Sequence, residues 1–167
     1  GSFTDNMATG FGSGGAISQF NGASDLYIDG TIFTTNSAYV GGAIAIGSSN
    51  SGNINIDNAT FTNNSSNRGG ALYLAFANNT SVDIYNGTFT GNTATGDGGA
   101  IFQFGTTLNI TNSRLSSNTA DFGVGGTGNG GAVFSTGATS VVTVDPSYIY
   151  GNTAVNGGAF FNAGGST

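Results

Sequence analysis

Residues 33–44 read Phe-Thr-Thr-Asn-Ser-Ala-Tyr-Val-Gly-Gly-Ala-Ile, and variants of this stretch recur along the chain. Its Gly-Gly-Ala tripeptide occurs six times, at intervals of 27 to 32 residues, starting at Gly14, Gly41, Gly69, Gly98, Gly130 and Gly157. A repeat of about 20 to 50 residues is typical of stacked units that bury their apolar sides only against one another. The sequence therefore predicts a solenoid.

A second pattern lies between the double glycines. Two apolar residues stand two apart, a large apolar residue follows five positions later, and an Asn follows three after that, as in Leu26, Ile28, Phe33 and Asn36. Four further units repeat the last two positions as Phe61 and Asn64, Phe89 and Asn92, Leu115 and Asn118, and Ile149 and Asn152. Apolar residues at every second position, in segments rich in Thr, Ile and Val, favour strands and exclude a helical pattern.

Each unit offers three short strands: one with the paired aliphatics, one with the Phe, and one opened by Gly-Gly-Ala. Stacked coils pair like strands about 4.8 Å apart, so like residues form columns. We expect Phe33, Phe61 and Phe89 to form one column, and the five Asn residues to form a second that satisfies backbone groups at the bend.

The fold class predicted is all-β: a single-stranded parallel β-helix of about six coils of roughly 28 residues. The crossover rule for parallel strands favours the right-handed form. We expect one domain over residues 1–167, with incomplete terminal coils at 1–16 and 157–167 and a loop insertion at 119–129.

The combination of Phe-x-x-Asn at Phe33–Asn36 with Gly-Gly-Ala-Ile at Gly41–Ile44 resembles the repeats of the polymorphic outer membrane proteins of chlamydiae and related surface β-helix proteins. The resemblance implies a right-handed parallel β-helix displayed outside the cell. Two units depart from the pattern, because Leu115 and Ile149 replace Phe.

Composition limits the function. The net charge is −6, all eight acidic residues are Asp, and the basic residues are Arg68 and Arg114. This balance argues against nucleic acid or an anionic membrane as a partner. No apolar run is long enough for a transmembrane helix. The uncharged surface, rich in Asn, Thr, Ser and Gly, is typical of extracellular structural proteins.

Catalysis is not expected, although parallel β-helices also carry polysaccharide-acting enzymes. Asp29 and Asp57 occupy equivalent positions in adjacent coils, and Asp145 recurs three coils later. Each follows a strand at a turn, where Asp commonly bonds the local backbone. Without His, Cys, Lys or Glu the sequence offers no triad or zinc site. We predict no catalytic residue, cofactor or metal.

An ice-binding face is a further alternative, since such faces carry regular Thr ranks. The Thr-x-Thr pairs at Thr60 to Thr62 and Thr88 to Thr90 do not repeat through every coil. The ranks are therefore too irregular to favour this function.

The two ends predict interfaces. The sequence begins within a Phe-x-x-Asn strand and ends just after Gly-Gly-Ala-Phe, so the end coils would expose unpaired strand edges. Either the chain is an adhesin or passenger-type fragment of a longer surface protein, or copies stack head to tail as a homopolymer in a filament or rod. We favour the polymer. The predicted interface residues at the two ends are Phe3, Asn6, Gly157, Gly158, Phe160 and Phe161.

Alternation also places Tyr73, Phe102, Phe134 and Phe161 on the outer side of their strands. We expect this aromatic row to face solvent and to serve lateral association or stacking on host-surface or matrix glycans. Possible glycosylation sites in Asn-x-Ser/Thr sequences are Asn58, Asn78, Asn86 and Asn109.

Overall fold

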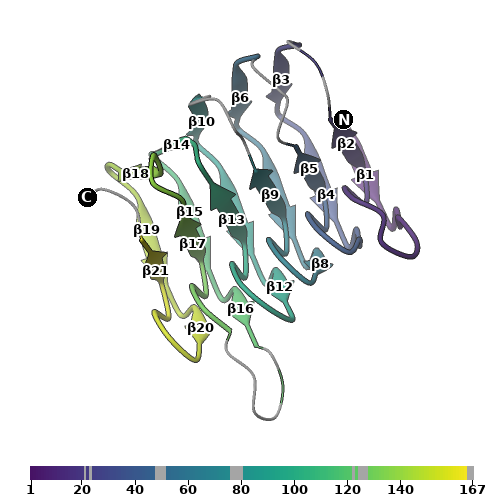
Figure 1. The fold of residues 1–167 in the computed structure, drawn as a ribbon. Coiled ribbons are helices and arrows are strands. Elements are labelled where there is room, and N and C mark those ends of the chain that lie inside the picture. Colours follow the sequence, from purple (N-terminus) through teal and green to yellow (C-terminus); the bar gives the residue numbers. More distant parts are fainter. Residues whose placement is uncertain are drawn as a thin grey trace.

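The computed structural model describes residues 1–20, 22, 24–47, 52–75, 81–121, 123 and 128–164. Across these residues all regular elements are β-strands, and they form four parallel sheets (Figure 1). The chain winds so that equivalent strands of successive turns pair within one sheet, and the two termini lie at opposite ends of the stack. The protein is an all-β parallel solenoid of about five turns.

Two sheets carry the sequence patterns between the double glycines. The Phe sheet contains, in spatial order, β1 (Ser2–Thr4), β4 (Ile32–Thr34), β7 (Thr60–Thr62), β11 (Thr88–Thr90), β15 (Arg114–Ser116) and β19 (Tyr148–Tyr150). The aliphatic sheet contains β3 (Leu26–Asp29), β6 (Ile54–Asp57), β10 (Ser81–Tyr85), β14 (Thr107–Thr111) and β18 (Val141–Val144).

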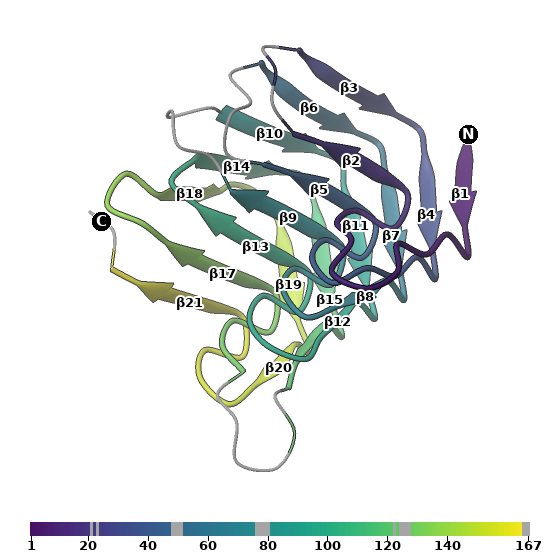
Figure 2. The same cartoon turned by 45° about the vertical axis from the view of Figure 1, so that its right-hand side comes forward.

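Two further sheets follow the Phe-x-x-Asn segment. The short sheet contains β8 (Ser65–Ser66), β12 (Thr93–Ala94), β16 (Thr119–Ala120) and β20 (Thr153–Ala154). The glycine sheet, which begins after each Gly-Gly-Ala, contains β2 (Ile17–Gln19), β5 (Ile44–Ile46), β9 (Leu72–Ala75), β13 (Ile101–Phe104), β17 (Val133–Thr136) and β21 (Phe160–Ala163). Figure 2 shows the aliphatic, Phe and glycine sheets as faces of one stack.

The structure confirms the predicted parallel solenoid but differs from the prediction in the number of strands per coil. The sequence predicted three strands in each coil, whereas four of the turns also carry a two-residue strand of the short sheet directly after the Asn. Pairs such as Thr93–Ala94 lack an apolar alternation, so the strand pattern gave no sign of them.

In-register pairing builds the core. Phe33 is paired with Phe61 and Phe61 with Phe89, so equivalent side chains lie directly above one another. These three rings are fully buried, together with the inward aliphatic residues of the central turns, such as Ile44, Ile56 and Leu72. Burial at about 25 cal/mol per Å² of apolar surface makes these columns the main source of stability.

The double glycine sets the corner before the glycine sheet. Gly69 has φ of +64°, a region that residues with a Cβ rarely adopt. A Cβ on Gly70 would lie 2.1 Å from the carbonyl oxygen of Gly99 in the next turn. The first glycine therefore permits the bend, and the second permits adjacent turns to approach at the strand spacing.

Candidate functional site

An internal ladder of Asn side chains runs along the bend between the Phe sheet and the short sheet. The side-chain amide of Asn64 donates to the Phe33 carbonyl and to Asn92 Oδ1, both at 3.0 Å. Asn64 Oδ1 in turn accepts from the backbone and side-chain N–H groups of Asn36 at 2.9 and 3.0 Å. The same arrangement continues to Asn6 at one end and to Asn118 and Asn152 at the other.

Stacked rings accompany this ladder inside the Phe sheet. The centroids of Phe33 and Phe61 lie 4.8 Å apart, and those of Phe61 and Phe89 lie 4.6 Å apart, with nearly parallel planes. Leu115 and Ile149 continue the column at the positions where the sequence lacks Phe. The two ladders are structural, because the three rings and the Asn side chains at Asn36, Asn64, Asn92 and Asn118 are fully buried.

The first and last turns end these columns in solvent. Phe3 and Phe160 are each 37% exposed, whereas Phe33, one turn inside, is fully buried. Asn6 is half-buried, while Gly157 and Gly158 are exposed. Strands β1, β2 and β3 lie at the sheet edges of one end of the stack, and β18, β19, β20 and β21 lie at those of the other, so each end presents open strand edges.

The aromatic row forms on the glycine sheet but is not the open surface expected from the alternation. Rings of Tyr73, Phe102, Phe134 and Phe161 stack in succession, with centroids 5.1, 5.1 and 5.9 Å apart. Phe102 and Phe134 are nevertheless only 5% and 7% exposed. The expectation of solvent exposure is therefore wrong for these two residues, although Tyr73 and Phe161 are half-buried.

Mutual stacking and a nearby cation account for this burial. The guanidinium of Arg68 lies 5.5 Å from the centroid of the Phe102 ring, within cation–π range. Burial also raises the pKa of the Tyr73 phenol, an effect that Arg68 opposes. Any contact function of this row stays a prediction.

The structure brings Asp29 and Asp57 together, since they are paired in adjacent turns at the end of the aliphatic strands. Asp29 accepts a hydrogen bond from the side-chain amide of Asn58 at 2.8 Å. The Asp57 carboxylate, and to a lesser degree that of Asp29, raises the pKa of the neighbouring Tyr27 phenol. Asp145 lies apart from this pair, because Tyr85 and Thr111 occupy the intervening turns.

An outer Asn ladder, missed in the sequence, crosses the possible glycosylation sites. Asn86 Nδ2 donates to Asn58 Oδ1 at 3.0 Å, and Asn112 Nδ2 donates to Asn86 Oδ1. Asn109 Nδ2 donates to Asp83 Oδ1 at 2.7 Å. The Nδ2 atoms of Asn58, Asn86 and Asn109, to which a glycan would be attached, thus already donate hydrogen bonds, while Asn78 lies outside the described residues. The signal in the sequence was the recurrence of Asn just after three of the aliphatic strands, β6, β10 and β14.

A buried polar cluster also escaped the sequence pattern. Gln103 is fully buried and donates to Ser135 Oγ at 2.7 Å, in the column that Ile46 and Leu74 occupy in earlier turns. The Ser140 hydroxyl accepts from the Gly105 amide at 2.8 Å. These bonds replace apolar packing in the later turns.

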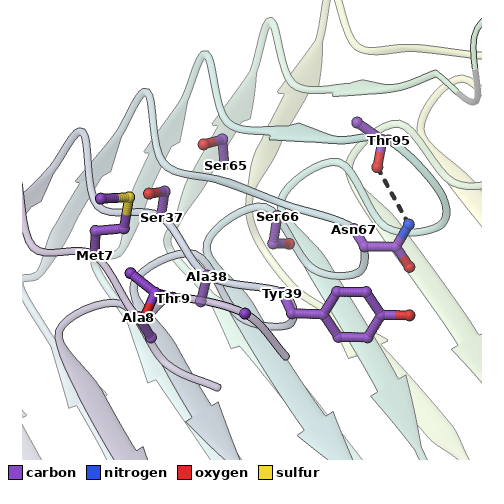
Figure 3. A pocket seen from close by; sticks show the side chains of 11 residues that line it. Met7, Ala8, Thr9, Ser37, Ala38, Tyr39, Ser65, Ser66, Asn67 and Thr95 are labelled. Atoms are coloured by element: carbon purple, nitrogen blue, oxygen red, sulfur yellow. Dashed lines mark hydrogen bonds between the residues drawn. The ribbon is translucent and has the colours of Figure 1, made fainter. Parts of the chain in front are cut away.

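A shallow groove runs over the short-sheet side of the first turns, beside Met7, Tyr39 and Asn67 (Figure 3). Its volume is about 480 Å³. Its lining comes from successive turns, because Ser37 is bridged to Met7 on one side and to Ser65 on the other. Asn67 Nδ2 donates to Thr95 Oγ1 at 3.2 Å at one end of the groove.

These features define a parallel β-solenoid with buried Phe and Asn ladders and double-glycine corners. In the comparison with protein families, residues 58–75 and 86–103 match the Chlamydia polymorphic membrane protein repeat. Each matched segment contains one Phe-x-x-Asn and one Gly-Gly-Ala. The chain therefore carries repeats of this family, as the sequence resemblance indicated.

No curated protein and no solved structure matches the chain. Among the described residues, no helix has the length and apolar character needed to cross a membrane. The described residues also hold no cluster of three or more carboxylate, imidazole or thiolate ligands for a metal ion.

Proposed function

We propose that this chain is a structural segment of a rod on the cell surface, and that its open edges pair with those of further copies. The observation that carries the proposal is the loss of burial in the end turns, where Phe3 of the Phe sheet and Phe160 of the glycine sheet are each 37% exposed. Open, unbulged strand edges with apolar residues beside them are templates for further strand pairing.

The two ends are complementary in their strand types. One end offers β19 and β21, and the other offers β1 and β2, in each case one edge of the Phe sheet and one of the glycine sheet. Head-to-tail stacking would place Ile149 over Phe3 and Phe160 over Ile17, which continues both columns. Such a contact joins different surfaces of the two copies, so it extends without closing.

The repeat family supports the surface location, because it is named for membrane proteins of Chlamydia. A non-enzymatic role agrees with this family and with the placement of Asp29 and Asp57 at the ends of β3 and β6, where Asn58 donates a hydrogen bond to Asp29. The second candidate is a passenger-type segment of a longer surface protein. The family match favours it, and the same open edges would then pair with further turns of the same polypeptide.

The substitution Ser18→Pro tests self-assembly at an open edge. The backbone groups of Ile17 and Gln19 bond to the neighbouring turn through Ala43 and Gly47. Because alternate residues of a strand bond to opposite sides, the Ser18 amide faces the open edge. Proline there removes the outward donor and leaves the internal bonds in place. We expect the unmodified chain to form fibres as its concentration rises, and Ser18→Pro to remain monomeric.

Sedimentation velocity and electron microscopy over a hundredfold concentration range provide the measurement. The matched control is Ser18→Ala, which keeps the amide and should assemble like the unmodified chain. If the unmodified chain is a monodisperse monomer at every concentration, self-assembly is wrong and the passenger-type segment takes its place.

A further inference from the structure

We infer that the groove beside Tyr39 binds a neutral oligosaccharide. None of the described residues that line it carries a charge, although the whole chain has a net charge of −6. A polyanionic glycan would meet a repulsive field from the rest of the molecule, whereas an uncharged sugar would not. The inference does not depend on assembly, because turns of a single chain form the groove.

Several hydroxyl groups line the groove. Ser37 and Ser65 are bridged across adjacent turns, and Thr9 and Thr95 lie at its margins (Figure 3). A hydroxyl both donates and accepts hydrogen bonds, as sugar hydroxyls do. The turns repeat at about 4.8 Å, a step comparable with the length of one pyranose ring, so successive sugar units would meet equivalent groups.

An aromatic surface stands beside these hydroxyls. Tyr39 is 44% exposed, and the ring of Phe11 holds it in an edge-to-face contact with centroids 5.1 Å apart and planes at 82°. The backbone of Tyr39 is fixed on both sides, since its N–H donates to the Gly12 carbonyl and its carbonyl accepts from Asn67, each at 2.9 Å. A rigid, exposed ring next to hydroxyl groups suits the apolar face and polar rim of a sugar.

Partial exposure makes Tyr39 a suitable residue for a test. Calorimetric titration of the full chain with neutral hexasaccharides of β-linked glucose and of β-linked N-acetylglucosamine should show binding to at least one of them. A sulfated heparin hexasaccharide should bind at least tenfold more weakly. Tyr39→Ala should weaken the binding about tenfold, the equivalent of one lost aromatic contact, whereas Tyr39→Phe should retain it.

Tyr27→Ala is the matched control, because Tyr27 is 66% exposed but lies on the aliphatic sheet. It should leave the affinity unchanged. Thermal unfolding of each variant shows whether the fold is retained. The proposal is overturned if neither neutral sugar binds, if the heparin fragment binds best, or if folded Tyr39→Ala binds as well as the unmodified chain. None of these outcomes bears on the fibres that test the proposed function.

Discussion

Gly70→Ala should destabilise the protein by about 4 kcal/mol or more, because the new methyl group has no space between two turns. A Cβ at this position would lie 2.1 Å from the Gly99 carbonyl oxygen and 2.7 Å from the Thr93 nitrogen. Both atoms belong to the backbone of the next turn, so no side chain can move aside to relieve the clash. Urea-induced unfolding followed by circular dichroism measures the change.

Gly30→Ala separates this steric effect from backbone conformation. Gly30 has φ of +54°, but a Cβ there would meet nothing within 4 Å. Its expected cost is the conformational one alone, about 1 to 2 kcal/mol. Equal destabilisation by the two substitutions would contradict the close approach of adjacent turns at the double glycine.

Asn64→Leu should cost about 3 to 5 kcal/mol, although the two side chains have the same branching and the same number of heavy atoms. The substitution removes the acceptor of the Asn36 backbone and side-chain N–H groups, and the donor to the Phe33 carbonyl. Asn36 and Asn64 are fully buried, so these groups would be left without water as well as without partners. Equilibrium unfolding in urea is again the measurement.

The matched control is Asn53→Leu, because Asn53 is exposed. Its effect should stay within about 0.5 kcal/mol. A similar small effect at Asn64 would mean that the internal ladder contributes little, and that apolar burial alone holds the bend.

The Phe and Asn columns could be predicted because their spacing within each repeat does not vary, and only stacking in register places such residues together. The short strand at Thr93–Ala94 could not be predicted, since two residues are too few to show an alternation of apolar and polar side chains. The buried Gln103 was also beyond prediction, because the equivalent position is aliphatic at Ile46 and Leu74, and only the structure shows that Ser135 pairs with Gln103.

Surface features were predicted less well than the core. The alternation of apolar residues along the strand assigned Phe102 to its outer side. This pattern carries no information about what covers the outer side, and the Phe102 ring is only 5% exposed. The groove beside Tyr39 had no sequence signal either. Its residues lie in β8 and in the segments that follow the Asn ladder, and only their placement in successive turns brings Tyr39, Asn67 and Thr95 together (Figure 3).

Disulfide trapping tests most directly whether successive windings lie in register. The chain has no cysteine, and Asn55 is paired with Asp83 one turn later. Strand neighbours lie about 4.8 Å apart, within the range of about 4.4 to 6.8 Å that a disulfide spans between Cα atoms. Thr143 is three turns from Asn55, since its partner is Asn109 and that residue pairs with Asp83.

We predict that dilute Asn55→Cys/Asp83→Cys oxidises completely to an intramolecular disulfide, measured by thiol titration and peptide mapping. Asn55→Cys/Thr143→Cys should keep both thiols free, because the two sites are separated by about 14 Å. Free thiols in the first variant, or an equally rapid intramolecular disulfide in the second, would contradict the solenoid.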